Sequence, residues 1–217
     1  MSVLFLLVSL LIGACAAVPE ISQATPLVVA HRGDSALAPE NTLAAYRLAL
    51  AKGVEAAECD VVVSRDRVPF LLHDETLDRT TNAKGPADRL SWAELSKLDA
   101  GGWKSDEWAG ERLPTLDQFL ALMQGRALAV VEIKVEGIEK EVVESFESAG
   151  TKPKDVMLFS FRESVMTYFA EHGRAWPRTW LVSGKLARAD RRDALFQRIQ
   201  GWGLKGLGFD RRSLDRA

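Results

Sequence analysis

Four short clusters of ionisable residues lie along the chain, each at the end of an apolar run typical of a β-strand. They are His31-Arg32-Gly33, Glu58-Cys59-Asp60, His73-Asp74 and Glu132-Ile133-Lys134. In a parallel α/β barrel, the C-terminal ends of the strands meet on one face and carry the active site. The clusters hold two of the chain's 3 histidines, and chance alone would rarely produce four of them. The pattern therefore predicts such a barrel, with its site on that face.

Strands and helices alternate after the first residues. The predicted strands are Leu27 to Ala30, Val54 to Val63, Leu128 to Lys134, Val156 to Phe161, Thr179 to Val182 and Leu204 to Phe209, with a short antiparallel return at Val68 to Leu72. Asn41-Thr42 opens a predicted helix whose apolar stripe includes Tyr46, further helices begin near Ile138 and Ala187, and another ends near Gly173. Capping boxes open a short helix at Ser91-Trp92-Ala93-Glu94 and a longer one at Thr115-Leu116-Asp117-Gln118. This alternation predicts right-handed βαβ units and a mostly parallel sheet.

Residues 74–113 interrupt the alternation, being polar and rich in Trp, Gly and turn signals. They predict an insertion after the second strand, on the active-site side. A closed (β/α)₈ barrel has eight strands and roughly 250 residues, whereas six barrel strands are recognised in these 217 residues. We therefore expect one barrel domain, residues 26–217, of this type but incomplete. Its open edges favour oligomerisation, because unpaired strands offer backbone groups to another chain.

The first residues differ from the rest. Met1 to Ala14 has no charged side chain and contains a short apolar stretch, which is typical of a signal peptide covering residues 1–16, followed by a linker at 17–25. Ile12-Gly13-Ala14-Cys15 resembles a bacterial lipobox, in which Cys15 would be lipidated. Cleavage before Ala17 is the alternative. The expected location is outside the cytoplasm, either periplasmic or anchored to a membrane through the lipid.

Overall composition gives no sign of a nucleic-acid partner. Hydrophobic residues make up 47% and charged residues 27% of the chain, with a formal net charge of −2, as in an ordinary globular protein. Of the 2 cysteines, Cys59 stands between two carboxylates on a predicted strand. Alternation along the strand points it outward, under the helices, as a small buried residue.

Three carboxylates are expected to converge on one volume. Glu58 and Asp60 are two residues apart on a strand, so their side chains leave the same face, and Glu132 and Lys134 repeat this geometry on another strand. Such carboxylates raise one another's pKa unless a cation lies among them. Ligands that are all oxygen suit Ca²⁺ or Mg²⁺ rather than zinc. The alternative is that each carboxylate pairs with its own Lys or Arg.

Two histidines are predicted on opposite rims of this volume. Since imidazole titrates near neutrality, one of His31 and His73 can accept a proton while the other donates one. Arg32 offers a planar fork of donors suited to phosphate, and Lys134 adds a point charge. Together with a divalent cation, these groups are suited to cleavage of a phosphodiester. His172, at a predicted helix end, is expected to be a surface residue.

The stretch from His31 to Gly85, which begins HRGDSALAPENT and ends LLHDETLDRTTNAKG, resembles the glycerophosphodiester phosphodiesterases. The segments GERLPTLDQFL and VVEIK and the pair Ser160-Phe161 match that family in the same order. The resemblance implies a (β/α)₈ barrel with an insertion after the second strand. It also implies hydrolysis of glycerophosphodiesters to sn-glycerol 3-phosphate and an alcohol, with Ca²⁺ or Mg²⁺.

Matching motifs also imply roles for individual residues. The implied roles are proton acceptor for His31, proton donor for His73, metal ligand for Glu58, Asp60 and Glu132, and phosphate contact for Arg32 and Lys134. Glu40 matches a position that lines the family's site, and a role in orienting His31 or Arg32 stays open. The family's last two strands, one of them carrying a Trp of the glycerol pocket, have no counterpart in this sequence. Phospholipase D-type activity on lysophospholipids or sphingomyelin, or an inert truncated product, are the alternatives; the Glu-Asn-Thr motif and the insertion favour the phosphodiesterase.

Overall fold

The computed structural model describes residues 27–173, 175–182, 197 and 199–209. The predicted signal segment with Cys15, the predicted linker and most of the helix predicted near Ala187 lie outside these residues. The elements are β1 Val29–His31, α1 Leu43–Ala51, β2 Ala56–Val63, β3 Pro69–Leu71, η1 Ala87–Arg89, α2 Trp92–Leu95, η2 Asp106–Trp108, α3 Leu116–Met123, β4 Leu128–Ile133, α4 Glu139–Ser148, η3 Pro153–Asp155, β5 Val156–Ser160, α5 Glu163–Glu171, β6 Arg178–Val182 and β7 Gly206–Phe209.

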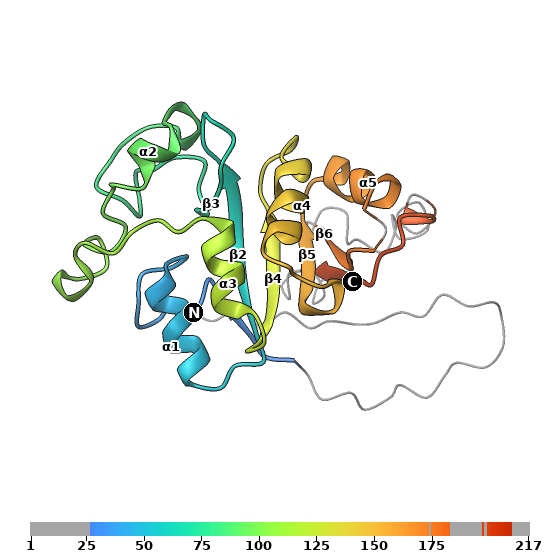
Figure 1. Cartoon of the computed structure of the whole chain (residues 1–217), viewed down its shortest axis with the longest axis horizontal. Coiled ribbons are helices and arrows are strands. Elements are labelled where there is room, and N and C mark those ends of the chain that lie inside the picture. The colour runs from blue at the N-terminus through green and yellow to red at the C-terminus, as the bar shows by residue number, and fades with distance from the viewer. Residues whose placement is uncertain (1–26, 174, 183–196, 198, 210–217) are drawn as a thin grey trace, which may run out of the picture.

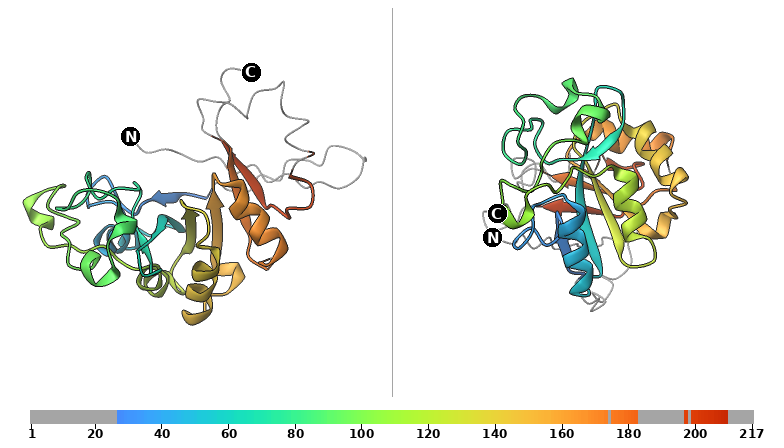
Figure 2. Two further views of the ribbon diagram at one scale, coloured as in Figure 1. Left: turned by 90° about the horizontal axis from the view of Figure 1, so that it is seen from above. Right: turned by 60° about the vertical axis from the view of Figure 1, so that its left-hand side comes forward.

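The sheet is a curled, incomplete barrel with α-helices on its convex side (Figures 1 and 2). Its strand order is β1-β2-β4-β5-β6-β7, with every neighbour parallel, and β3 pairs antiparallel with β2. The six predicted barrel strands and the short antiparallel return are therefore confirmed. Element ends differ from the prediction by one to a few residues; β1, for example, includes His31.

Successive side chains of β2 point alternately toward the helices and into the barrel. Ala57, Cys59 and Val61 point outward and pack in the main core with helix residues such as Tyr46 and Phe119, whose rings lie 4.6 Å apart. Cys59 is fully buried there, as predicted. The opposite face of β2 lines the barrel interior.

A layer of apolar side chains fills the barrel interior below the site. It consists of Ala56 on β2, Val130 on β4, Phe159 on β5 and Leu181 on β6, all buried. This layer supports the polar residues that follow it along β2 and β4.

No helix among the described residues is long and apolar enough to cross a membrane.

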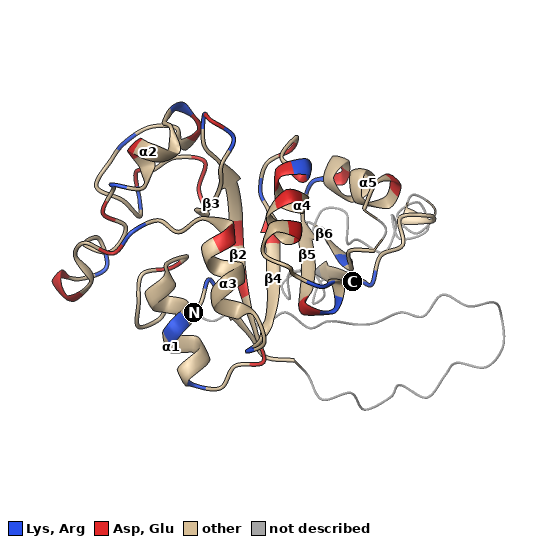
Figure 3. Cartoon of the chain, viewed as in Figure 1, with Lys and Arg blue, Asp and Glu red and all other residues tan. Residues whose placement is uncertain are grey.

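Residues 74–113 lie at the C-terminal end of β2 (Figure 1) and share a second, smaller core with Val62 on β2, Phe70 on β3 and Leu72 after it. Both predicted capping boxes form: the Glu94 side chain accepts from the Ser91 amide at 2.8 Å, and Thr115 and Gln118 cap one another at 2.9 and 3.1 Å. Acidic and basic residues are interspersed along this insertion (Figure 3).

The insertion contacts the loop between β1 and α1. Lys104 Nζ donates to the carbonyl of Ser35 at 2.8 Å, and Trp108 Nε1 donates to the carbonyl of Leu37 at 3.2 Å. Both contacts lie on the loop that follows His31. The insertion is therefore on the active-site side of the sheet, as the sequence predicts.

Candidate active site

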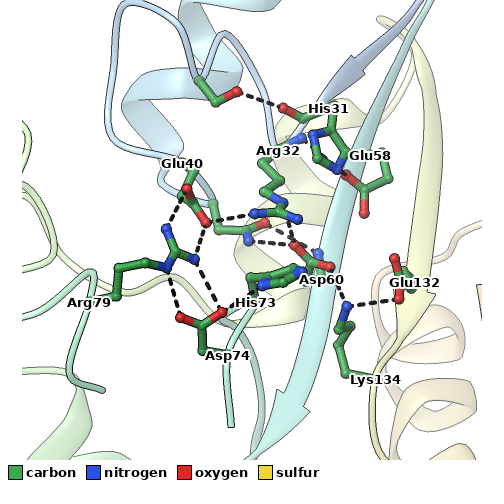
Figure 4. A network of polar contacts seen from close by, with 12 residues as sticks. His31, Arg32, Glu40, Glu58, Asp60, His73, Asp74, Arg79, Glu132 and Lys134 are labelled. Atoms are coloured by element: carbon green, nitrogen blue, oxygen red, sulfur yellow. Dashed lines mark hydrogen bonds and ion pairs between the residues drawn. The ribbon is translucent and has the colours of Figure 1, made fainter. Parts of the chain in front are cut away.

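The sheet register places the predicted site residues next to one another. His31 on β1 is opposite Glu58 on β2, and Asp60 on β2 is opposite Glu132 on β4. Because β3 runs back along β2, the Leu72 amide donates to the Asp60 carbonyl at 3.1 Å, which returns His73 to the same level. Figure 4 shows these side chains, with Arg32, Glu40 and Lys134, facing one volume. All the predicted site residues that the structure describes are thus brought together, and Cys15 lies outside the described residues.

Glu58, Asp60 and Glu132 form an acidic cluster in which one ligand atom from each residue lies within 4.8 Å of the others. All three are buried, Asp60 completely. Burial and the charges of Asp60 and Glu132 raise the pKa of Glu58 well above its ordinary value. Burial, followed by the charge of Asp60, likewise raises the pKa of Glu132. The predicted mutual repulsion is therefore present.

Basic side chains neutralise part of this cluster. Lys134 Nζ lies 2.9 Å from Glu132 Oε1 and 3.3 Å from Asp60 Oδ1, and Arg32 Nε lies 3.0 Å from Asp60 Oδ2. Burial alone would lower the pKa of Lys134, but the charges of Asp60 and Glu132 raise it. Asp60 and Glu132 thus have basic partners. If all three carboxylates had such partners, the alternative stated above, in which each carboxylate pairs with its own Lys or Arg, would hold.

Glu58 is different. Its Oε2 accepts the Arg32 backbone N–H at 3.0 Å and lies 3.9 Å from His31 Nε2, while its Oε1 is buried without a hydrogen bond. Asp60 Oδ1 also lacks a hydrogen bond, although Lys134 is nearby. Buried carboxylate oxygens without hydrogen bonds are costly unless a cation compensates them. These oxygens make the cluster a fitting site for a hard divalent cation.

A left-handed turn directs Arg32 into the site. Arg32 and Gly33 have φ angles of 58° and 78°, a region where side chains beyond glycine are strained. A Cβ on Gly33 would lie 2.7 Å from the carbonyl carbon of Ala45, so glycine is also required for space. The turn lets the Arg32 guanidinium reach Glu40 Oε1 at 2.9 Å as well as Asp60.

Asn41 and Tyr46 hold Asp60 from behind. The amide nitrogen of Asn41 donates to Asp60 Oδ2 at 2.9 Å, and its amide oxygen accepts from the Tyr46 hydroxyl at 2.8 Å. The sequence pattern predicts a helix start at Asn41 and an apolar helix residue at Tyr46, and neither prediction includes a contact with Asp60. The Glu-Asn-Thr motif was the signal that pointed to this position.

The two histidines lie in different surroundings. Burial and the neighbouring Arg32 charge lower the pKa of His31. His73 Nδ1 lies 2.6 Å from Asp74 Oδ1. A hydrogen bond from Arg79 lowers the pKa of Asp74 to about 2, so Asp74 is ionised at neutral pH. The sequence predicts no role in the site for Asp74 or Arg79.

His172 is exposed at the end of α5 and stacks on Tyr168, which confirms the predicted surface position.

Comparison with known proteins agrees with this geometry. The model of the glycerophosphoryl diester phosphodiesterase family matches residues 31–209. A glycerophosphodiester phosphodiesterase of Caldanaerobacter subterraneus subsp. tengcongensis is 38% identical over 141 residues, covering 62% of this chain and 58% of the relative. Another, from Bacillus subtilis, is 28% identical over 207 residues, covering 88% of this chain and 70% of the relative. The chain spans about half the length of several curated relatives that it matches.

Solved structures also match. A phosphodiesterase of Oleispira antarctica, solved with the product sn-glycerol-3-phosphate, is 32% identical, with a TM-score of 0.73 over 84% of this chain and 74% of that one. A glycerophosphodiester phosphodiesterase of Agrobacterium tumefaciens is 29% identical, with a TM-score of 0.68 over 87% of this chain and 97% of that one. With its family match, its barrel topology and its acidic cluster, this chain belongs to the glycerophosphoryl diester phosphodiesterase family.

Proposed function

We propose that this protein hydrolyses glycerophosphodiesters to sn-glycerol 3-phosphate and an alcohol, with Ca²⁺ or Mg²⁺. The observation that carries the proposal is the buried Glu58, Asp60 and Glu132 cluster, flanked on one face by two histidines and two basic side chains. The names of the relatives and the product found in the Oleispira antarctica structure support the same substrate class.

Glu58, Asp60 and Glu132 would hold the cation. When bound, a divalent cation supplies positive charge that neutralises the phosphate and its transition state. Arg32 and Lys134 lie against the same cluster and contribute further positive charge for the phosphate oxygens. Their existing contacts with Asp60 and Glu132 keep both side chains oriented toward the site.

His73 is assigned as proton donor to the leaving alcohol. The ionised Asp74 carboxylate accepts a hydrogen bond from Nδ1–H and orients the ring, which leaves the opposite nitrogen, Nε2, to carry the proton that is donated. His31 takes the acceptor role that its family motif implies, removing a proton from the attacking oxygen. The two roles are consistent with the positions of the histidines, since His31 ends β1, His73 follows β3, and both face one volume.

The test is release of glycerol 3-phosphate from glycerophosphocholine by the purified protein. EDTA should abolish the release, and Ca²⁺ or Mg²⁺ should restore it. Restoration by Zn²⁺ alone would contradict the choice of cation, and full activity in EDTA would contradict the metal requirement. Choline release from lysophosphatidylcholine or sphingomyelin instead would favour a phospholipase D-type enzyme. Absence of turnover on the whole panel would favour an inert product.

A further inference from the structure

We propose that Arg79, in the insertion, is a positioning residue that fixes His73 and Arg32 relative to one another. The proposal rests on the proposed function, because that function gives His73 and Arg32 their roles in the reaction. Arg79 itself contacts no member of the acidic cluster in the hydrogen bonds and ion pairs that the described residues form. It acts through two carboxylates.

The guanidinium of Arg79 spans Glu40 and Asp74 (Figure 4). Its Nη1 and Nη2 donate to the two oxygens of Glu40 at 2.8 and 2.7 Å. Its Nε donates to Asp74 Oδ2 at 2.7 Å, and Nη2 also reaches Asp74 Oδ1 at 3.3 Å. All three nitrogens of one side chain are therefore engaged with two acidic partners.

Each of these carboxylates holds a different group of the proposed mechanism. Asp74 Oδ1 lies 2.6 Å from His73 Nδ1, and Glu40 Oε1 accepts from Arg32 Nη1 at 2.9 Å. Glu40 follows β1 and Asp74 follows β3, so the two halves of the arrangement come from separate segments. Arg79 is the partner that both halves share.

The charges of Glu40 and Asp74 explain why both carboxylates share Arg79 as a counter-ion. Burial alone would raise the pKa of Glu40, but its hydrogen bond from Arg79 and the charges of Arg32 and Arg79 lower it. With Asp74 also ionised, removal of Arg79 would leave two carboxylates without their common counter-ion. A lysine would supply the charge but only a point contact, whereas the planar fork of arginine binds both carboxylates at once.

The Arg79 side chain is 42% exposed, and partly exposed ion pairs contribute little to stability. The effect should therefore appear in turnover rather than in folding. In metal sites, removing a residue that hydrogen-bonds to a metal ligand and orients it typically costs roughly 10- to 100-fold in activity, and we expect a similar loss here. Misplacement of a reacting group by ~1 Å has a comparable effect.

Lys104 offers a matched control, because it also joins the insertion to the β1–α1 loop, where it donates to a backbone carbonyl, that of Ser35, and lies over the Trp103 ring. In the full chain, Arg79→Ala should lower kcat for glycerophosphocholine by roughly 10- to 100-fold, with a smaller change in KM. Lys104→Met should leave kcat nearly unchanged. Arg79→Lys should fall between wild type and Arg79→Ala, and added guanidinium ion should restore part of the turnover of Arg79→Ala.

Double variants test whether the residues act as one unit. Asp74→Asn combined with Arg79→Ala should cost little more than either change alone, as expected for coupled residues. Full additivity, or an unchanged kcat in Arg79→Ala, would overturn the proposal. Should Arg79→Ala not fold, Arg79→Lys carries the same test, and wild-type kcat in that variant would count against the proposal.

A spectroscopic measurement separates failure of this proposal from failure of the proposed function. In the ¹⁵N spectrum, neutral His73 should hold its proton on Nδ1, and Arg79→Ala should weaken that preference whether or not the chain turns over substrate. An unchanged His73 spectrum in Arg79→Ala would refute the positioning role. A changed spectrum in an inactive wild type would retain the positioning role and reject the enzyme activity.

Discussion

Asn41 contacts Asp60 at two points, donating from its side-chain amide to Oδ2 and accepting the Asp60 backbone N–H on its amide oxygen at 3.2 Å. Both contacts are buried, and Asn41 has a φ of 57°. Asparagine tolerates this left-handed conformation better than most residues. The side chain therefore fixes both the carboxylate and the backbone of one proposed ligand.

Asn41→Ala should remove these bonds and leave the buried Asp60 backbone N–H without its Asn41 acceptor, whereas the Tyr46 hydroxyl, which loses its 2.8 Å acceptor, keeps the Glu58 carbonyl at 3.3 Å. A buried polar group left unsatisfied costs about 1 to 3 kcal/mol, so the free energy of unfolding should fall by at least that amount. Urea denaturation measures it. Tyr46→Phe, which removes only the hydroxyl, should cost less. Equal losses in the two variants would show that the contacts to Asp60 contribute nothing.

Metal-free stability should depend on pH through Glu58. Because its pKa is raised above the ordinary value of 4.5 in the folded protein, the native state binds the proton more tightly than the unfolded chain does. The stabilising contribution is present below 4.5 and is lost as pH rises toward the raised pKa. In EDTA, the free energy of unfolding should thus fall less steeply with pH in Glu58→Gln than in wild type. The exposed Glu144→Gln should follow the wild-type curve, and parallel curves for all three proteins would contradict the argument.

A divalent cation should restore the free energy of unfolding that is lost as pH rises in EDTA. Binding to the native state alone stabilises by about 2.7 kcal/mol at a cation concentration of 100 times Kd, so Ca²⁺ or Mg²⁺ should raise the Tm of wild type. Glu58→Gln, Asp60→Asn and Glu132→Gln should each respond only at higher cation concentration, because each removes one proposed ligand of the cluster. Calorimetric titration gives the affinities directly. A Tm that rises equally in all four proteins would place the cation elsewhere.

The histidines should affect turnover and not cation affinity. General acid or base catalysis contributes roughly 10²- to 10⁴-fold, so His31→Ala and His73→Ala should each lower kcat by an amount in that range. His172→Ala is the control, since this residue is exposed at the end of α5. Near-normal kcat in His73→Ala would show that the proton donor is another group.

A substitution at Cys15 distinguishes the two predicted modes of export, lipidation and simple cleavage. If the lipobox resemblance is meaningful, expression in a Gram-negative host gives a membrane-associated protein. Cys15→Ser should convert it to a soluble periplasmic form. Mass spectrometry of the N-terminus reports the lipid directly. A soluble wild type that begins at Ala17 would identify simple secretion instead.

Much of the fold follows from the sequence because strand alternation and capping are local properties. The apolar runs before His31 and His73 predict strands, and both capping boxes form at the predicted residues. The exact strand ends do not follow, since they depend on pairing with a neighbour. Thus β1 extends to His31 because that residue pairs with Glu58.

The acidic cluster also follows from the sequence, because residues two apart on a strand share a face. The partners of its members do not. Arg79 and Glu40 are 39 residues apart, and no periodicity relates a residue in an irregular insertion to one in a distant loop. The helix predicted to open at Asn41-Thr42 is confirmed, with Thr42 as its N-cap, but the contact of Asn41 with Asp60 does not follow from the sequence, because a residue type suited to a helix start also suits a left-handed turn that reaches back to a strand.

The segments that supply the site, β1 with its loop, β2, β3 with the insertion, and β4, are adjacent in the sheet and contiguous in sequence. A chimera that carries residues 29–135 of this chain on the remaining strands of a relative would therefore transfer the whole polar network in one piece. The junctions would cross the β4–β5 interface, the packing of α3 against α4, and the edge of β1 that pairs with the last strand of a closed barrel. Such a chimera would show whether the later strands set substrate preference while the proposed proton-transfer groups stay in place.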